Sequence, residues 1–281
     1  MTAAVLSGRE LGARIRESVT AGISARPPGA PPPVLAVVTA TADEATAWYV
    51  RSITSAAGKA GITCQVIDLG AEAAPVAISA ALADLNADES VSAIMLQTPL
   101  PGSAKLADFG HLIDPAKDVD GANPLSLGRL AAGLPAFAPA TAEAVVRLLD
   151  HYQVEIGGRH AVIVGRSTVV GKPAAHLLLD RHATVTICHS RIRDLPAITR
   201  TADILVAAAG RRWMLTADDI QPGAVVIDVG TNPTSDGGTT GDVDPSAAQV
   251  AGAVSPVPGG VGPVTTALLL EHVLRAHGTV I

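Results

Sequence analysis

A turn bounded by two glycines is the first feature of this sequence whose residue types suit ligand binding. Its residues run Gly165-Arg166-Ser167-Thr168-Val169-Val170-Gly171-Lys172-Pro173, directly after an apolar run at 160–164. A glycine turn between a strand and a helix lets the backbone approach a pyrophosphate, which then accepts hydrogen bonds from free N–H groups at the helix start. Because the full G-x-G-x-x-G spacing is absent, a tight turn without a ligand is an equally good interpretation of this pattern alone.

A second polar group follows the next apolar run and reads Cys188-His189-Ser190-Arg191. In a nucleotide-binding sheet the end of the second strand contacts the adenosine ribose. An acidic residue there favours the NAD hydroxyl, and cationic or hydroxyl groups favour the NADP phosphate. Ser190, Arg191 and the nearby Arg166 therefore predict NADP rather than NAD. For His189 we expect a cofactor-side or structural role rather than catalysis.

Alternating strand and helix patterns would position these residues. In the first half we expect strands at 34–38, 62–69 and 93–96, a helix that is entered at 41–44 and runs to about residue 60, and another helix at about 75–86. In the second half we expect strands at 160–164, 184–188, 203–208 and 224–229, a helix at 172–181 and a last helix at 265–277. This alternation predicts parallel sheets, and continuous apolar strands are typical of sheets covered by helices on both faces.

Composition narrows the class of protein. The chain has 281 residues, about two typical domains, and its net charge of −6 with no basic block argues against nucleic acid. No apolar run reaches the roughly 18 residues of a membrane span, and the N-terminus lacks a secretory-signal pattern. Cys64 and Cys188 have neither metal-ligand nor redox spacing, so we expect reduced thiols in a cytoplasmic protein and no metal site.

Four further blocks accompany the glycine turn: Tyr49-Val50, Leu96-Gln97-Thr98-Pro99-Leu100-Pro101, Pro115-Ala116-Lys117-Asp118-Val119-Asp120-Gly121 and Pro256-Val257-Pro258-Gly259-Gly260-Val261-Gly262-Pro263. In order and spacing they resemble the bifunctional methylenetetrahydrofolate dehydrogenase/cyclohydrolase family, from about residue 49 to residue 263. The resemblance implies two α/β domains with the active site in the cleft between them, and a homodimer. Residues 1–142 would form the folate domain, with a C-terminal helix at 265–281 packing back on it. Residues 143–264 would form a Rossmann-type NADP-binding domain.

The resemblance also implies which residues form the site. Tyr49, Gln97 and Asp120 would bind the folate and carry the chemistry. A buried carboxylate such as Asp120 suits the N–H donors of a pterin. Gln97 both donates and accepts hydrogen bonds. We expect Lys117 and Asp118 to hold their own loop rather than the ligand.

The full predicted sets are larger. The substrate would contact Tyr49, Val50, Leu96, Gln97, Pro99, Leu100, Asp120, Pro258, Gly259, Gly260 and Pro263. The cofactor would contact Gly165, Arg166, Ser167, Val170, Gly171, His189, Ser190, Arg191, Ala208, Gly210, Val229 and Gly230.

One position departs from the family at the centre of its hydrolytic chemistry. The family has Tyr-Val-x-x-Lys, and this chain has Ile53 at the lysine. On a helix, residues 49 and 53 share a face, so the lysine would point an amine at the same pocket as the tyrosine. Arg51 and Lys59 would lie on other faces. Isoleucine has no proton to exchange, and losing a general acid or base typically costs roughly 10²–10⁴ in rate.

These observations predict an NADP-dependent dehydrogenase that oxidises 5,10-methylenetetrahydrofolate, with weak or absent cyclohydrolase activity. Hydride transfer chiefly requires positioning and does not depend on the lost amine. Other departures lie on the folate side: Thr98, Asn123 and the segment 139–144, which replaces Pro-Cys-Thr-Pro-x-Gly. They leave two alternatives open. One is a paralogue that handles another one-carbon or heterocyclic substrate; the other is a folate- or NADP-binding protein without turnover.

Overall fold

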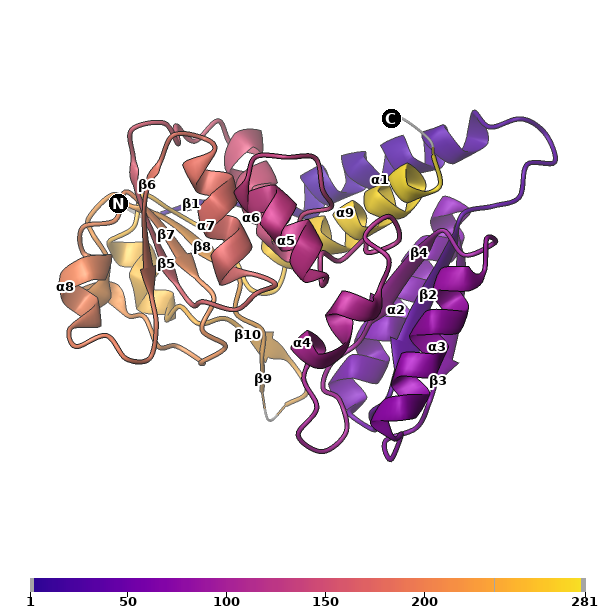
Figure 1. Cartoon of the computed structure of the whole chain (residues 1–281). Coiled ribbons are helices and arrows are strands. Elements are labelled where there is room, and N and C mark those ends of the chain that lie inside the picture. Colours follow the sequence, from indigo (N-terminus) through magenta and orange to yellow (C-terminus); the bar gives the residue numbers. More distant parts are fainter. Residues whose placement is uncertain (1–2, 235, 279–281) are drawn as a thin grey trace. The chain divides into compact units, whose positions relative to one another are not determined.

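The computed structural model describes residues 3–234 and 236–278, which divide into two compact units (Figure 1). Unit 1 comprises the residues up to Ala13 together with Thr141–Thr265, and unit 2 comprises Arg14–Ala140 together with the residues from Thr266 onward. The helices α1 (Arg9–Ser24) and α9 (Val261–Ala276) each contribute residues to both units.

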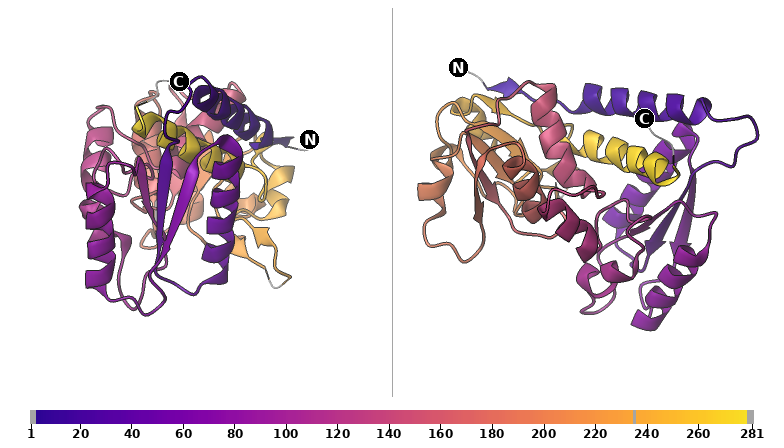
Figure 2. Two further views of the ribbon diagram at one scale, coloured as in Figure 1. Left: turned by 90° about the vertical axis from the view of Figure 1, so that its right-hand side faces the viewer. Right: turned by 45° about the horizontal axis from the view of Figure 1, so that its top comes forward.

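Unit 2 is built on a three-stranded parallel sheet of order β3-β2-β4. Its strands are β2 (Val34–Thr39), β3 (Thr63–Asp68) and β4 (Ala93–Leu96). The helices α2 (Glu44–Ala60) and α3 (Pro75–Ala87) cover opposite faces of this sheet (Figure 2, left). Shorter helices follow β4 at α4 (Leu106–Phe109), η1 (Gly110–Leu112) and α5 (Pro124–Ala131).

The ends of α2 are set by local chemistry. The Asp43 carboxylate accepts a hydrogen bond from the backbone N–H of Thr46, and this caps the first turn. Gly61 ends the helix in the left-handed region with φ 86°, a conformation that glycine adopts without steric cost. The helix therefore spans the predicted residues, and Tyr49 and Ile53 lie on consecutive turns.

Unit 1 contains a six-stranded sheet of order β1-β11-β8-β7-β5-β6, in which every pairing is parallel. The strands are β1 (Ala4–Val5), β5 (His160–Val164), β6 (Thr184–Cys188), β7 (Ile204–Ala207), β8 (Val225–Asp228) and β11 (Ala253–Val254). The helices are α6 (Ala140–His151), α7 (Gly171–Leu179), α8 (Leu195–Thr199), η2 (Ala217–Asp219) and η3 (Pro245–Gln249), and a hairpin pairs β9 (Asn232–Pro233) with β10 (Thr239–Thr240).

The strand order of unit 1 indicates where on the sheet a ligand would bind. From β5, the chain goes to β6 on one side and then returns to β7 on the other side. This reversal makes a topological switch point between β5 and β7, and ligands of such sheets bind beyond the carboxyl ends of the strands at that point. The predicted two-domain, parallel α/β fold is confirmed.

The start of the chain differs from the predicted division. Residues 3–13 group with unit 1 rather than with the expected 1–142 domain, because β1 pairs with β11 through Ala4↔Ala253 and Val5↔Val254. The last helix begins at Val261, four residues before the predicted start, and the end of the predicted segment 265–281 lies outside the described residues. Across residues 3–234 and 236–278, no helix combines the length and apolar character of a membrane span.

Candidate functional site

The glycine turn of unit 1 makes two backbone approaches that only glycine permits. Gly165 has φ 138°, and a Cβ atom there would lie 2.1 Å from the carbonyl oxygen of Ala208, in the loop after β7. A Cβ atom on Gly171 would lie 2.1 Å from the carbonyl oxygen of Gly165. The structure therefore brings three predicted cofactor residues together at the switch point between β5 and β7.

The same turn leaves donors available for an anion. The Ser167 Oγ atom accepts hydrogen bonds from the N–H groups of Val170 and Gly171, at 3.1 and 3.4 Å. In the described part of the chain, the N–H groups of residues 166–169 have no acceptor, and Arg166 is exposed and forms no ion pair. Free amides beside a free guanidinium at a helix start fit the pyrophosphate of a dinucleotide.

The end of β6 lies next to this turn. The N–H of Gly165 donates to the Cys188 carbonyl at 2.9 Å, and Ser190 and Arg191 are exposed just beyond it. The His189 Nδ1 atom accepts from the N–H of Arg191 at 3.1 Å, so this imidazole holds the backbone of its own turn. Hydroxyl and guanidinium groups at this strand end suit a phosphate on the adenosine ribose.

Two buried acids under the loops after β7 and β8 were missed by the sequence reasoning. The N–H of Gly210 donates to Asp242, and the N–H of Gly230 donates to Asp228. Asp242 is fully buried and Asp228 is 4% exposed. These two amides are therefore already engaged by protein carboxylates. The only sequence signal is an acid next to glycine in Gly241-Asp242, which usually marks a turn.

In unit 2, Tyr49 and Asp120 lie close enough to influence each other electrostatically. Burial raises the pKa of the Tyr49 phenol, and the charge of Asp120 raises it further. Desolvation raises the pKa of Asp120 to about 7, the charge of Asp118 adds to this, and His272 opposes it. A carboxyl group with such a pKa is poised between its neutral and ionised forms near neutrality.

Gln97 presents an unsatisfied donor. It follows β4 and is 6% exposed. Within residues 3–234 and 236–278, its Nε2 is the only buried side-chain nitrogen or oxygen that has no hydrogen-bond partner. A buried polar group left unpaired costs about 1–3 kcal/mol, so native proteins rarely leave one without a reason. A ligand oxygen would satisfy this amide.

Lys117 and Asp118 stabilise the loop that carries Asp120 through hydrogen bonds, as predicted for these two residues. The Lys117 ammonium donates to the carbonyls of Leu85, Asn86 and Asp88, at 3.1, 2.9 and 2.7 Å. The Asp118 carboxylate accepts from the N–H groups of residues 122 and 123 at 2.8 Å and from the Ser126 hydroxyl at 2.9 Å. Both side chains are committed to structure.

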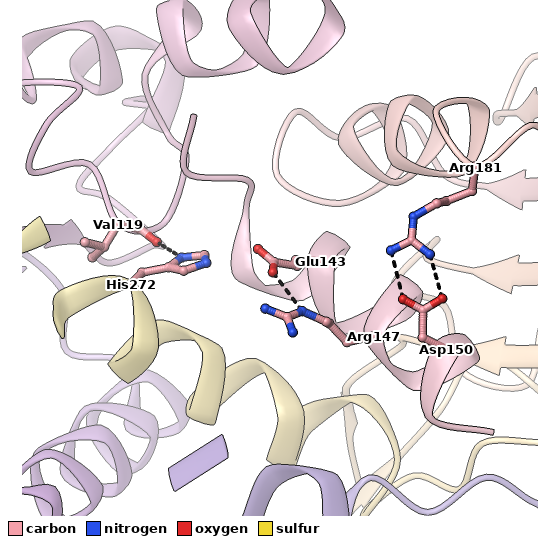
Figure 3. A network of polar contacts seen from close by, with 6 residues as sticks. All are labelled: Val119, Glu143, Arg147, Asp150, Arg181 and His272. Carbon is pink, nitrogen blue, oxygen red and sulfur yellow. Dashed lines mark hydrogen bonds and ion pairs between the residues drawn. The ribbon is translucent and has the colours of Figure 1, made fainter. Parts of the chain in front are cut away.

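His272 supports the same loop from α9 and was not predicted. Its Nδ1–H donates to the Val119 carbonyl at 2.8 Å (Figure 3), and the residue is fully buried. Because 153 positions separate the two residues, no local pattern indicates the contact. His272 thus lies beneath the residue that precedes Asp120.

Position 53 lies in the core. Ile53 is fully buried on the inner face of α2, and Val50, Leu96 and Leu100 are 6%, 4% and 8% exposed. Their side chains therefore pack within the unit. A cavity of about 520 Å³ lies beside α2 and is lined by neither Tyr49 nor Ile53; its lining residues are Thr39, Thr41, Thr46, Ala47, Val50, Arg51, Thr54, Ser55, Val66 and Asp68.

The remaining predicted substrate residues belong to unit 1. Pro258, Gly259, Gly260 and Pro263 form the segment leading into α9 and its first turn, where the N–H of Gly8 donates to the Gly259 carbonyl at 2.9 Å. The Thr98–Pro99 and Val257–Pro258 peptide bonds are cis. The predicted substrate residues thus fall into two groups, one in each unit.

One departure on the folate side has a structural explanation. The Asn123 side chain caps α5 by accepting from the N–H of Leu125 at 2.7 Å, and it donates to the Ile113 carbonyl at 2.7 Å. Both cysteines are free. Among the described residues, no group of three or more His, Cys, Asp or Glu side chains is arranged to hold a metal ion.

Comparisons with known proteins agree with this arrangement. Residues 6–120 match the model of the tetrahydrofolate dehydrogenase/cyclohydrolase catalytic domain, and residues 139–280 match that of the family's NAD(P)-binding domain. The chain is 58% identical to bifunctional protein FolD 1 of Saccharopolyspora erythraea, over 96% of this chain and 93% of that protein.

Solved structures give the same result. The bifunctional FolD methylenetetrahydrofolate dehydrogenase/cyclohydrolase of Campylobacter jejuni is 36% identical, with a TM-score of 0.94 over 98% of both chains. The Trypanosoma brucei methylenetetrahydrofolate dehydrogenase-cyclohydrolase, solved with NADP cofactor and an inhibitor, is 33% identical, with a TM-score of 0.93 over 99% of this chain and 98% of that chain.

Proposed function

Because the chain belongs to the tetrahydrofolate dehydrogenase/cyclohydrolase family, we propose that it oxidises 5,10-methylenetetrahydrofolate to the methenyl form with NADP. We further propose that its cyclohydrolase activity is weak or absent. The first part draws support from relatives named for both activities and from the Trypanosoma brucei enzyme bound to NADP. The second part rests on a residue of this chain.

The residues of unit 1 supply a dinucleotide site. Free amides at 166–169 and the Arg166 guanidinium would hold the pyrophosphate, and Ser190 and Arg191 would hold the ribose phosphate. When bound, NADP supplies the acceptor for the hydride that leaves the bridging carbon of the folate. Val170, Val229 and the glycines of the loops would shape the site around it.

The residues of unit 2 would bind and orient the folate. The ionised Asp120 carboxylate would accept hydrogen bonds from the pterin N–H groups, and the unpaired Gln97 amide would donate to a ligand oxygen. Tyr49 would stack on the ring system. None of these roles requires proton transfer, because two nitrogens flank the bridging carbon and stabilise the cation that develops on hydride loss.

Ile53 is the observation that carries the loss of hydrolysis. Its side chain can neither donate nor accept a proton. Because it is also fully buried, water cannot reach this position to act in place of an amine. Arg51 and Lys59 are exposed on other faces of α2, and Arg51 lines a cavity that Ile53 does not line. The guanidinium is in any case a poor base, because its pKa is above about 12.

A paired assay on the purified native chain tests both parts. Formation of methenyltetrahydrofolate would be followed with NADP and with NAD, and hydrolysis of the methenyl compound would be measured separately against its spontaneous rate. We expect NADP-dependent turnover and hydrolysis at the spontaneous rate. Substantial hydrolysis would overturn the interpretation of Ile53. Binding of both ligands without turnover would favour a binding protein, and absence of folate binding would favour a paralogue with another substrate.

The family resemblance also leads us to propose a homodimer and a cytoplasmic location. Molar mass in solution, measured by light scattering at several protein concentrations, tests the first of these. A single monomeric mass at every concentration would contradict it.

A further inference from the structure

Two buried carboxylates connect the loops that follow β7 and β8. Asp228 ends β8, and its Oδ1 accepts from the N–H groups of Gly230 and Asp242 at 2.9 and 3.0 Å. Its Oδ2 accepts from the N–H of Val243 at 2.9 Å. Asp228 therefore fixes the backbone on both sides of the Asp242 side chain.

Asp242 in turn holds the loop after β7. Its Oδ2 accepts from the N–H groups of Ala209 and Gly210 at 2.6 and 2.9 Å, and its Oδ1 accepts from the N–H of Arg211 at 2.7 Å. The Asn232 amide also donates to Oδ1, at 2.9 Å. One carboxylate thus gathers three consecutive backbone amides, and hydrogen bonds to an ionised acceptor are about twice as strong as neutral ones.

Glycines make room for both carboxylates. A Cβ atom on Gly230 would lie 2.3 Å from the Asp242 Oδ1, and a Cβ atom on Gly241 would lie 1.8 Å from the Asp228 Oδ2. Any larger residue at either position would displace an acid. Gly230, predicted as a cofactor residue, therefore serves the loop through Asp242.

The hydrogen bonds from the amides of residues 209–211 to Asp242 determine which backbone groups of the loop remain available to a ligand. In a trans peptide the C=O group points opposite to the N–H group of the same unit. The carbonyls of Ala208, Ala209 and Gly210 consequently point away from Asp242. No residue in the described part of the chain donates a hydrogen bond to any of the three. The Ala208 oxygen packs against Gly165, so the carbonyls of Ala209 and Gly210 are the acceptors that the loop presents.

This loop lies beside the switch point, on the β7 side of the glycine turn. In dinucleotide-binding sheets the turn after the first strand holds the pyrophosphate, and the end of the second strand holds the adenosine. The nicotinamide therefore lies over the half of the sheet on the other side of the first strand, which here contains β7 and β8. The nicotinamide carboxamide carries an NH₂ group with two donors. These two donors match the two unpaired carbonyls of Ala209 and Gly210.

We propose that Asp242 is a positioning residue for the dinucleotide, which turns the carbonyls of Ala209 and Gly210 toward the carboxamide NH₂ of the nicotinamide. The proposal rests on the proposed function only in that a nicotinamide dinucleotide binds at this sheet edge. It assigns the nicotinamide end to a loop whose shape is set by an acid that the ligand does not touch.

Calorimetric titration of an Asp242→Asn variant tests the assignment without any turnover. The asparagine keeps one acceptor oxygen but places an NH₂ group against backbone donors, so we expect NADP affinity to fall about 10- to 100-fold. Affinity for 2′,5′-ADP, which lacks the nicotinamide, should stay unchanged. Asp244→Asn is the matched control, because the Asp244 carboxylate accepts from the N–H of Ser246 at 2.8 Å and not from the amides of residues 209–211. This control should bind both ligands as the native chain does.

A ligand analogue tests the carbonyls in the native chain, so the proposal does not depend on a variant that folds. The 3-acetylpyridine analogue of NADP has a methyl group in place of the NH₂ group, and the thionicotinamide analogue keeps the NH₂ group. We expect the acetylpyridine analogue to bind about tenfold more weakly than NADP and the thionicotinamide analogue to bind comparably. The acetylpyridine difference should shrink in the Asp242→Asn variant.

Several results would overturn the assignment. Equal loss of NADP and 2′,5′-ADP affinity in Asp242→Asn would mean that the acid supports the whole unit rather than the nicotinamide loop. Equal native affinity for NADP and the acetylpyridine analogue would remove the role of the carbonyls. If the native chain bound 2′,5′-ADP and NADP equally well, only this inference would fail; if it bound neither, the proposed function would fail as well.

Discussion

Replacing Ile53 by lysine would introduce an amine at a fully buried position on the inner face of α2. The lysine stem retains much of the apolar contact of the isoleucine, but the ammonium group would lose its hydration. Buried lysines respond by lowering their pKa, by up to about 3–5 units. An amine with a pKa near neutrality is suited to general acid and base chemistry. The substitution would therefore destabilise the folded protein and also supply the general acid or base that hydrolysis needs.

The loss of folding stability can be calculated from the change in the pKa of the lysine. Moving a lysine from about 10.4 to about 7 costs roughly 4–5 kcal/mol, at about 1.4 kcal/mol per unit. The unfolded chain then binds more protons than the folded one between these two pH values, so the unfolding free energy of the variant should rise as the pH increases from about 7 to about 10. Below about pH 7 the full penalty applies. It approaches a large fraction of the roughly 5–15 kcal/mol that stabilises a typical domain.

The assay compares native chain, Ile53→Lys and Ile53→Met. Methionine has a similar volume and no titratable group, so it should cost less than about 1.5 kcal/mol and leave hydrolysis unchanged. In Ile53→Lys we expect hydrolysis of methenyltetrahydrofolate to rise about 10²–10⁴-fold, with dehydrogenase turnover retained. Urea unfolding at several pH values, monitored by circular dichroism, gives the stability of all three proteins.

Three results would refute this reasoning. The first is hydrolysis above the spontaneous rate in the native chain. The second is a folded, dehydrogenase-active Ile53→Lys protein without any gain in hydrolysis. The third is an equal gain in Ile53→Met, because the gain could not then come from the amine.

The remaining predictions concern the two ligand sites. With a pKa of about 7, Asp120 is increasingly protonated as the pH falls, so kcat/KM for the folate should drop about tenfold per unit below pH 7, and a flat profile from pH 5 to 7 would contradict its role. Arg191→Gln should weaken NADP binding about tenfold or more and leave NAD binding unchanged, as measured by titration; equal effects on the two would argue against a phosphate contact. Gly171→Ala places a Cβ atom 2.1 Å from the Gly165 carbonyl oxygen, so it should lower both NADP affinity and the unfolding free energy, the latter by about 1–3 kcal/mol in urea titration; an unchanged affinity would show that the turn tolerates opening.

Local patterns were sufficient for the central strands and for the glycine turn. The strands at 93–96, 160–164 and 184–188 have the predicted bounds, because buried parallel strands are continuous apolar runs ended by polar residues. The glycines of the turn mark close backbone approaches, and this is visible in sequence spacing alone.

Features that depend on distant residues could not be predicted in this way. The strands β1 and β11 have two residues each, too few to produce a periodic signal, and only their pairing places the start of the chain in unit 1. Asp242 follows a glycine and resembles an ordinary turn acid. Its function depends on the amides of residues 209–211, about thirty positions earlier.

The hydrogen bond from His272 to the Val119 carbonyl has a consequence for how the protein is made. Unit 2 needs α9, whose residues are synthesised after all of the intervening chain of unit 1. While translation proceeds, the loop before Asp120 lacks the support of His272 until the final helix has left the ribosome. Domains generally fold as units in the order of their synthesis, but here most of unit 2 is synthesised before most of unit 1 and is nevertheless completed after it. The proposed folate site thus acquires its final form only when almost the whole polypeptide exists.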